Sequence, residues 1–529
     1  GGNCGDQGLK SLSTGLMPLW DALGQCLKCT HNRPNLHHVA TVMLPLIESF
    51  MVVFKSSISN TPSSLQRSST SSSGIHGSQL PQPQSSSLGE QAESPPSSRA
   101  PAAMSAEAYF QSFTDAHKKV LNMLVRASPS LLSGSFSLLV HNPRVLDFDN
   151  KRSYFYQQLR KNDSQMARPQ LKINVRRKYV FDDSYQQFAG KSGSEIRRGR
   201  LNVHFRGEEG VDVGGLTREW FQELSREMFN PDYALFKPST GDKITYQPNS
   251  QSWANPDHLM YFKFVGRVIG KAICDERLFD AYFTRSFYKH ILGRKVDYRD
   301  IEAIDPDYYK SLQWMLENDI TDVVEETFSV EVDDFGQMRI IDLIPNGRKI
   351  PVTEENKHEY VRLVTEQRLT ASIRDQINSF MTGFYELVPK ELIQIFNEQE
   401  LELLISGMPD IDVDDWRNNT EYHGGYNMSS AQIQWFWRAV RSFDQEERAK
   451  LLQFVTGTSK VPIGGFSKLR GSSGVQKFQI HRDFSSTNRL PTAHTCFNQL
   501  DLPMYESYET LRSQLLLAIS ECSTGFGFS

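Results

Sequence analysis

The chain has 529 residues, of which 39% are hydrophobic and 23% are charged, and its formal net charge is −4 at pH 7. This length and composition predict a globular protein of two or three domains, and the acidic balance argues against a dedicated nucleic-acid surface, which is usually basic. Only six cysteines occur in this length, so we expect no disulfide framework and a reducing compartment.

Helical and polar stretches alternate at the start of the chain. Residues 1–55 have helical apolar spacing and predict the end of an upstream helical region. Their most apolar run, 39–54, is too short to cross a bilayer, so we expect no membrane span. Residues 56–104 are rich in Ser, Pro and Gln and predict a disordered linker, and residues 105–170 predict a helical segment before the main domain. Because the chain begins Gly-Gly-Asn-Cys without an initiator methionine, we expect a C-terminal piece of a longer protein.

A pair of cysteines, Cys26 and Cys29, is followed by His31, His37 and His38, which could indicate a zinc site. The two thiols fall at i and i+3 of a predicted helix, and no second Cys pair follows. Helical packing is therefore the favoured interpretation, and we predict no metal site.

Residues 171–417 mix strands with helices. Alternating apolar residues predict strands at 171–175 and 201–205, and the apolar run 256–276 predicts a buried helix. Helical periodicity predicts further helices at 216–228, 279–293, 307–318, 356–380 and 389–407.

A predicted hairpin, 327–332 with 338–343, places Phe335 in its turn. An aromatic side chain there indicates either a contact folded back onto the core or a partner-binding residue, and both interpretations stay open. A polar stretch, 418–428, contains Gly424 and Gly425 and predicts a hinge.

Residues 429–529 predict a smaller domain of helices and strands. Ser430 begins one predicted helix, and Asp444 with Glu447 forms a plausible capping box for the next. A strand at 477–480 follows, and the last predicted helix, 507–522, carries Cys522 on its apolar face, where a packing role is favoured.

Cys496 differs from Cys522 because it lies outside any apolar periodic run. Pro491 and Pro503 bracket it, and each fixes its own φ and lacks a backbone donor, so the segment predicts a constrained loop that leads into a short strand. His494 is two residues away and shares a face with Cys496 if the chain is extended there. We interpret Cys496 as a nucleophile.

A free thiol is only a few per cent thiolate at neutral pH, and hydrolases correct this with a base that usually comes from a distant part of the chain. No such base stands out here, which suits a substrate that is already activated, such as a thioester. An amine that attacks the thioester must lose protons, and Asp501 is a candidate to help, although a loop-closing hydrogen bond is an equal alternative for it. A cysteine hydrolase and a non-catalytic docking module remain competing hypotheses.

The stretch Leu490 to Pro503 resembles the catalytic-cysteine signature of HECT-type ubiquitin ligases, and the similarity extends over roughly 171–529. The closing residues, 520–527, look most like those of the very large Huwe/Tom-type ligases. The other motifs that carry the resemblance are Gly207-Glu208-Glu209-Gly210, Arg218-Glu219-Trp220, Phe229-Asn230-Pro231, Tyr261-Phe262-Lys263-Phe264-Val265-Gly266-Arg267, Gln434-Trp435-Phe436-Trp437 and Leu452-Gln453-Phe454-Val455-Thr456-Gly457-Thr458-Ser459.

The resemblance implies an α+β, bilobal fold. A larger, mostly helical N-lobe, 171–417, would bind a ubiquitin-conjugating enzyme, and a smaller α/β C-lobe, 429–529, would accept ubiquitin as a thioester on Cys496 and transfer it to a substrate lysine. A flexible hinge, 418–428 with Gly424 and Gly425, would let the lobes swing.

The resemblance also implies roles for single residues. Thr495 and His494 match the residues that flank the nucleophile, and Phe526 matches a tail phenylalanine used during transfer to lysine. Phe335 and Leu292 would line the groove for the conjugating enzyme.

Some relatives bind a second ubiquitin through aromatic residues of the N-lobe. Tyr233 matches that pattern, whereas Pro238 and Leu369 replace aromatics and put this exosite in doubt. The implied partners are a ubiquitin-conjugating enzyme, ubiquitin and protein substrates, with no cofactor, no nucleic acid and no membrane, in the cytoplasm and nucleus.

Overall fold

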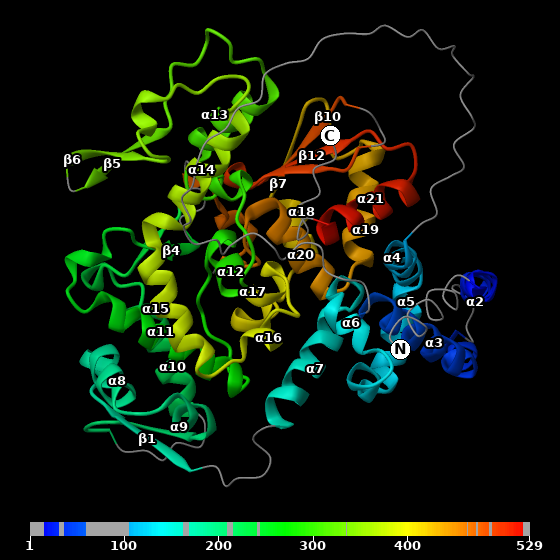
Figure 1. The fold of residues 1–529 in the computed structure, drawn as a ribbon, viewed down its shortest axis with the longest axis horizontal. Coiled ribbons are helices and arrows are strands. Elements are labelled where there is room, and N and C mark those ends of the chain that lie inside the picture. Colours follow the sequence, from blue (N-terminus) through cyan, green and yellow to red (C-terminus); the bar gives the residue numbers. More distant parts are fainter. Residues whose placement is uncertain are drawn as a thin grey trace, which may run out of the picture. The chain divides into compact units, whose positions relative to one another are not determined.

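The computed structural model divides the chain into two compact units, residues 1–150 and 151–529. Within them the structure describes residues 15–30, 36–59, 105–161, 169–208, 215–240, 244–334, 336–462, 464–471, 474–485 and 489–521. Each unit is described by itself below, and Figure 1 labels the elements.

The first unit is helical. Aromatic side chains form its core: the ring centroid of Phe50 lies 4.1 Å from that of Phe113 and 5.4 Å from that of Trp20. Its elements are α2 (Met17–Thr30), α3 (Leu36–Ser59), α4 (Ala106–Ala116), α5 (Lys118–Ala127), η1 (Pro129–Ser133), α6 (Ser137–His141), η2 (Pro143–Val145) and the start of α7 (Phe148–Lys161). Residues 1–55 and 105–170 are predicted as separate segments, but the helices on both sides of 56–104 pack together in the structure.

The second unit begins with a larger, mostly helical part, residues 151–406, which we call the N-terminal lobe. Its elements are β1 (Gln170–Val175), η3 (Arg177–Tyr179), α8 (Val180–Ala189), α9 (Gly193–Arg198), β2 (Arg200–Phe205), α10 (Gly215–Glu227), η4 (Pro231–Tyr233), β3 (Phe236–Pro238), β4 (Tyr246–Pro248), η5 (Ser252–Ala254), α11 (His258–Cys274), α12 (Arg285–Ile291), η6 (Tyr298–Ile301), α13 (Pro306–Glu317), β5 (Ser329–Asp334), β6 (Gln337–Asp342), η7 (Gly347–Lys349), α14 (Lys357–Leu369), η8 (Ala371–Ile373), α15 (Arg374–Tyr385), α16 (Lys390–Ile393) and α17 (Glu398–Ser406).

Helices α11 and α15 form the centre of this lobe and run side by side in Figure 1. The two backbones touch at glycines: a Cβ on Gly266 would lie 2.1 Å from the Phe380 carbonyl oxygen, and one on Gly383 would lie 2.0 Å from that of Lys263. Only glycine permits so close an approach. Most of α11 is buried, which agrees with the buried helix predicted from its apolar run.

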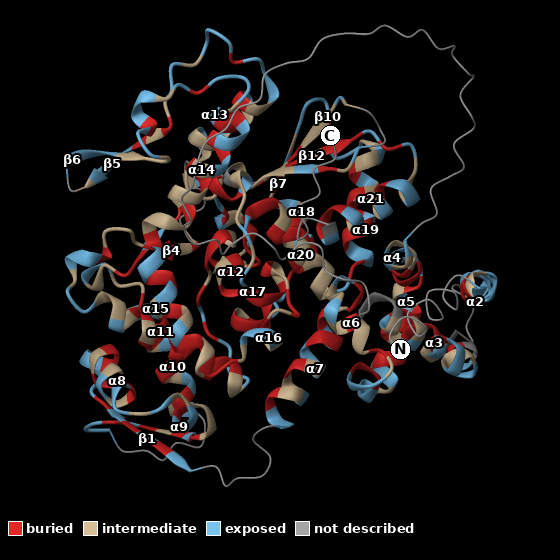
Figure 2. Ribbon diagram, in the orientation of Figure 1, coloured by how far each residue is buried: buried red, intermediate tan, exposed pale blue. Residues whose placement is uncertain are grey.

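The hairpin β5–β6 lies at the edge of the lobe. Its strands pair antiparallel, with Val332 opposite Arg339, as the sequence predicts. Figure 2 shows most of the hairpin as exposed or half-buried, and Met338, Ile340 and Val332 are exposed on it.

The remaining part, residues 413–521, is the C-terminal lobe. Its elements are α18 (Val413–Asn418), β7 (Thr420–His423), α19 (Ala431–Ser442), α20 (Gln445–Thr456), η9 (Phe466–Lys468), β8 (Arg470–Gly471), β9 (Gly474–Val475), β10 (Phe478–Asp483), β11 (Thr492–His494), η10 (Thr495–Phe497), β12 (Gln499–Pro503) and α21 (Tyr508–Glu521). Four strands form one sheet in the order β11-β12-β10-β7, in which β10 runs parallel to both β7 and β12.

The C-terminal lobe begins earlier than the sequence analysis expected. Trp416 of α18 is fully buried and stacks 5.0 Å from Phe466, and β7 pairs with β10. The paired glycines follow β7, and a Cβ on Gly424 would lie 3.2 Å from the Cβ of Arg482 on β10. Gly424 and Gly425 therefore belong to the lobe itself, and residues 407–412 form the connection to α17.

Three predicted helices are shorter than their periodicity suggested, and one of them, 389–407, is divided into α16 and α17. In 279–293 only α12 is helical, because residues before Thr284 are extended and Tyr246 forms a β-bridge with Phe283. The predicted helix 356–380 breaks at Thr370 into α14 and α15.

Among the described residues, no helix has both the length and the apolar character needed to cross a membrane.

Candidate active site

The cysteine loop connects the two outermost strands on one side of the C-terminal sheet. Strand β11 pairs antiparallel with β12, with His494 opposite Gln499, and the short turn η10 between them carries Cys496. The side chain of Cys496 lies outside the described part of the structure. The backbone nevertheless confirms the predicted arrangement of a constrained loop leading into a short strand.

Asn498 fixes the end of this loop. Its φ is +49°, in the left-handed region that asparagine tolerates better than most residues. Its fully buried side chain donates from Nδ2 to the Gln476 and Arg470 carbonyl oxygens at 2.8 and 3.0 Å. The asparagine therefore ties the loop after Cys496 to the segment before β10.

His494 and Asp501 face each other across β11 and β12. Nε2 of His494 lies 3.0 Å from Oδ2 of Asp501, and Gln499 donates from Nε2 to Oδ1 of Asp501 at 2.7 Å. The hydrogen bond to Asp501 raises the pKa of His494. Burial acts to raise the pKa of Asp501, but the hydrogen bonds from His494 and Gln499 outweigh it and lower this pKa. The pair therefore favours an imidazolium beside a carboxylate.

The N-terminal lobe also reaches the cysteine loop. Glu302, directly after η6, accepts hydrogen bonds from the backbone N–H and the hydroxyl of Thr495 and lies near His494. Burial raises the pKa of Glu302 to about 7, against the opposing effects of His494 and Thr495. Nζ of Lys310 on α13 lies 4.7 Å from the ring centroid of Phe497. The cysteine loop is thus bordered by charged groups from both lobes, and the sequence analysis named neither Glu302 nor Lys310.

Comparison with known families places this geometry in context. A family model described as "HECT-domain (ubiquitin-transferase)" matches residues 222–529, which include the cysteine loop and most of both lobes. The chain belongs to the HECT family.

Similar proteins are described as E3 ubiquitin-protein ligases. The chain is 55% identical over 513 residues to "E3 ubiquitin-protein ligase TOM1-like" of Neurospora crassa, covering 97% of this chain and 12% of that protein. It is 54% identical over 512 residues to "E3 ubiquitin-protein ligase TOM1" of Saccharomyces cerevisiae, covering 97% and 15%. It is 51% identical over 539 residues to "E3 ubiquitin-protein ligase HUWE1" of Mus musculus, covering 98% and 12%. The chain therefore spans a small part of the length of these relatives.

The HECT lobes meet at helix α17, where buried carboxylates contact the C-terminal lobe. Glu402 accepts from Thr458 Oγ1 at 2.8 Å, from the Ser459 backbone N–H at 3.2 Å, and from Nε2 of Gln453. All of these groups are buried. The interface between the lobes is therefore polar and fully packed at this point.

Glu400 joins a third element to the same helix. Its carboxylate contacts Lys151 of α7 at 2.8 Å and Lys450 of α20 at 3.7 Å, and its side chain is 2% exposed. Burial acts to raise the pKa of Glu400, but Lys151 and then Lys450 outweigh it and lower this pKa. Removing one lysine would leave a buried charge with less compensation, which is costly.

The other residues predicted to form HECT sites are placed unevenly. Phe335 and Phe526 lie outside the described residues, so their roles stay predictions. Leu292 is 1% exposed, and its carbonyl oxygen accepts from Gln394 at 3.1 Å. In this conformation the Leu292 side chain is part of the core, which argues against a direct contact with a conjugating enzyme.

The three positions that correspond to the second ubiquitin-binding site of some relatives differ in their exposure to solvent. Tyr233 donates from its hydroxyl to Asp182 at 3.1 Å, and Leu369 is 1% exposed. Pro238 is exposed on β3. In this conformation of the described residues, these three positions do not form a shared apolar surface.

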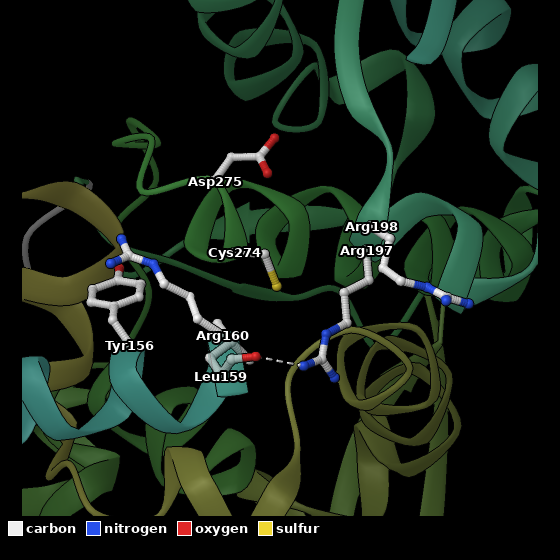
Figure 3. Close-up of a pocket in the computed structure, with 7 residues that line it drawn as sticks. All are labelled: Tyr156, Leu159, Arg160, Arg197, Arg198, Cys274 and Asp275. Carbon is white, nitrogen blue, oxygen red and sulfur yellow. Dashed lines mark hydrogen bonds between the residues drawn. The ribbon is translucent and has the colours of Figure 1, made fainter. Parts of the chain in front are cut away.

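A small pocket of about 20 Å³ lies between α7, α9 and the end of α11. Figure 3 shows Arg160, Arg197 and Arg198 around it, with the Cys274 sulfur between them and Arg197 donating to the Leu159 carbonyl oxygen at 3.0 Å. Its volume is little more than that of one water molecule, so we assign it no role in the chemistry.

Among the described residues, no group of three or more His, Cys, Asp or Glu side chains could hold a metal ion.

Proposed function

We propose that this chain is a ubiquitin transferase that accepts ubiquitin from a conjugating enzyme on Cys496 and passes it to a substrate lysine. The HECT match over 222–529 carries the proposal. The position of Cys496 supports it, because η10 holds this residue at a turn between two short strands, beside the His494–Asp501 pair.

The first step is a thiol exchange. The thiolate of Cys496 attacks the carbonyl carbon of the ubiquitin thioester on the conjugating enzyme, the new carbon–sulfur bond forms, and the old one breaks to release the enzyme's thiolate. A cationic His494 in the same loop favours the thiolate form of Cys496. Because one thioester replaces another, the step needs no strong base.

The second step is aminolysis. The neutral lysine amine attacks the Cys496 thioester, an amide bond forms, and the Cys496 sulfur leaves. A lysine ammonium loses two protons over this step: one ends on the sulfur and the other must pass to a base. Asp501 is the carboxylate of the loop that serves this purpose in our proposal.

The hairpin β5–β6 supports docking of a conjugating enzyme to the N-terminal lobe. Met338 is 61% exposed, Ile340 is exposed on the same face of the hairpin, and Val332 is exposed on its other face. Apolar side chains gathered on an exposed hairpin are typical of protein-interaction sites.

We also propose that the lobes pivot at residues 407–412. This segment connects α17 of one lobe to α18 of the other, whereas Gly424 and Gly425 are packed beside Arg482 within the C-terminal lobe. A pivot between the lobes would separate Glu402 from Thr458 and Glu302 from Thr495 as the C-terminal lobe swings between the two steps.

The proposed function is tested by incubating the chain with activating enzyme, conjugating enzyme and ubiquitin, and by resolving the products on a gel with and without thiol. We expect a thiol-sensitive ubiquitin adduct that Cys496→Ala abolishes and Cys522→Ala retains. Loss of the adduct in the Cys522 variant alone would refute the assignment.

The same samples separate the alternatives. A hydrolase would cleave a reporter fused to the ubiquitin C-terminus without a conjugating enzyme. A docking module would bind the conjugating enzyme but form no thiol-linked product.

A further inference from the structure

The outer face of the C-terminal sheet carries a row of ionisable side chains that ends at the cysteine loop. In register across the sheet, His423 of β7 neighbours His481 of β10, and His481 neighbours Asp501 of β12. Residues at alternate positions, such as Ile480 and Leu500, are buried on the opposite face. The row therefore occupies the face that is not used for the core.

The contacts in this row are close enough for the groups to influence one another. The imidazole centroids of His423 and His481 lie 4.6 Å apart, and Nε2 of His481 lies 3.0 Å from Oε1 of Gln479. Asp501 contacts His494 on its other side at 3.0 Å. Asp501 thus stands between two histidines, one from β10 and one from β11.

The pKa values of the two histidines beside Asp501 are shifted in opposite directions. Burial lowers the pKa of His481, and the neighbouring His423 and His494 lower it further. Asp501 has the opposite effect and acts to raise this pKa. The hydrogen bond to Asp501 raises the pKa of His494. Near neutral pH, therefore, His494 favours the charged form and His481 the neutral form.

Other charged groups of the described residues lie around the row, and Asp483 is two positions after His481 on the same face of β10. Glu421 lies 3.9 Å from His423, and Lys477 lies 3.4 Å from Glu421. From the N-terminal lobe, Glu302 and Lys310 act on His494. Among these described groups, His423, His494 and Asp501 are the ones that act on His481.

We propose that His481 is a positioning residue for aminolysis, which acts through Asp501 and makes the transfer of ubiquitin to lysine sensitive to mild acid. This inference rests on the proposed function, because it concerns the second of the two steps. His481 contacts neither the thioester nor the lysine in this proposal, and its effect is on the basicity of Asp501.

The proton balance shows how the effect arises. Of the two protons that the lysine ammonium loses, one ends on the Cys496 sulfur and the other passes to the Asp501 carboxylate and then to solvent. A neutral His481 leaves Asp501 with one cationic neighbour, His494. A protonated His481 adds a second positive charge, which makes the carboxylate a weaker proton acceptor and slows aminolysis.

The test is a single-turnover chase in the full chain. Cys496 is first loaded with ubiquitin, the activating enzyme is quenched, and free lysine is added at pH values between about 5.5 and 8.5. The rate per loaded molecule is compared between the wild type and His481→Gln. Because the same acceptor is used, the titration of free lysine cancels in the ratio of the two rates.

We expect the wild-type rate to fall, as the pH drops below about 6.5, by a factor about threefold larger than that of His481→Gln, because the pKa of His481 is lowered from the ordinary histidine value. His423→Gln should shift the wild-type decline to higher pH, because it removes a group that lowers the pKa of His481. His358→Gln on α14, an exposed histidine of the other lobe, is the matched control and should follow the wild type.

The outcomes distinguish this inference from the function on which it rests. If the wild type forms no thiol-sensitive adduct, the proposed function fails. If the wild type loads and discharges normally but His481→Gln has the same pH profile, only the role of His481 is overturned. A His481→Gln rate that is reduced equally at every pH would also overturn it, since that is the result of a merely structural role.

Discussion

Thr458 Oγ1 donates a 2.8 Å hydrogen bond to Oε1 of Glu402, and both side chains are buried where the two lobes meet. Glu402 belongs to α17 of the N-terminal lobe, and Thr458 follows α20 of the C-terminal lobe. The same carboxylate also accepts from Ser459 and Gln453. Three hydrogen-bond donors of the C-terminal lobe therefore contact one buried carboxylate of the N-terminal lobe.

Glu402→Gln should weaken this docking by about 1–3 kcal/mol, because the new amide NH₂ would face a donor in a buried site. A pair of fluorophores, one on each lobe, would report a larger mean separation. Glu398→Gln is the matched control: Glu398 lies on the same helix, is equally buried and pairs with Arg285 and Arg294 within the N-terminal lobe. It should lower the stability of that lobe without separating the fluorophores. The same mean distance between the fluorophores in Glu402→Gln and Glu398→Gln would contradict the role of Glu402.

Lobe docking should strengthen as the pH falls. Burial raises the pKa of Glu302 from its ordinary 4.5 to about 7 where it meets the cysteine loop, so the docked state binds this proton more tightly than the undocked state. The contribution of Glu302 to docking of the lobes is present in full below its ordinary pKa of 4.5 and is lost as the pH rises through about 7.

Glu302→Gln should remove most of this dependence, because the amide does not titrate. The measurement is the separation between the lobes of the full chain, followed by fluorescence across the range from about pH 5 to pH 8.5. An unchanged pH response in the variant would show that another group controls docking.

The cysteine loop should depend on Asn498 for its shape. Asn498→Ala removes two hydrogen bonds to carbonyl oxygens and places alanine, which tolerates a positive φ less well than asparagine does, at a φ of +49°. We expect a loss of about 2 kcal/mol in local stability, measured as faster hydrogen exchange in residues 492–503. Asn498→Gly tolerates the positive φ but lacks the side chain, so it should show the hydrogen-bond part of the loss alone. If both variants exchange like the wild type, Asn498 does not hold the loop.

Two placements of the hinge make different predictions. Gly424 and Gly425 have φ values of +69° and +93°, which proline cannot adopt, so Gly424→Pro with Gly425→Pro should unfold part of the C-terminal lobe. Asp410→Pro, at an exposed position of the connection 407–412, should instead leave both lobes folded and slow turnover by stiffening the pivot. Thermal unfolding and transfer rate, measured on the same samples, separate the two. Normal turnover in a folded Asp410→Pro variant would remove this segment from the mechanism.

Sequence reasoning was most successful where a local pattern determines the structure. The alternating residues of 171–175 and 201–205 form β1 and β2, and the Asp444–Glu447 capping box is present. Both features depend on neighbouring residues, so no knowledge of distant contacts was needed.

Features that depend on distant contacts were missed. Residues 420–423 are polar and precede two glycines, and their role as β7 becomes visible only through pairing with β10. Glu302 was not selected for the same reason, because nearly two hundred positions separate it from Thr495. Leu292 was assigned by resemblance to a surface, whereas packing makes it part of the core here.

The central claim is that the sulfur of Cys496 carries ubiquitin as a thioester, and replacing that sulfur with oxygen tests it most directly. In the presence of activating enzyme, conjugating enzyme and ubiquitin, Cys496→Ser should accumulate an adduct that resists thiol but is cleaved by mild alkali, as an ester is, whereas the wild-type adduct is cleaved by thiol. A thiol-sensitive adduct that persists in Cys496→Ser would place ubiquitin on another cysteine and contradict the account.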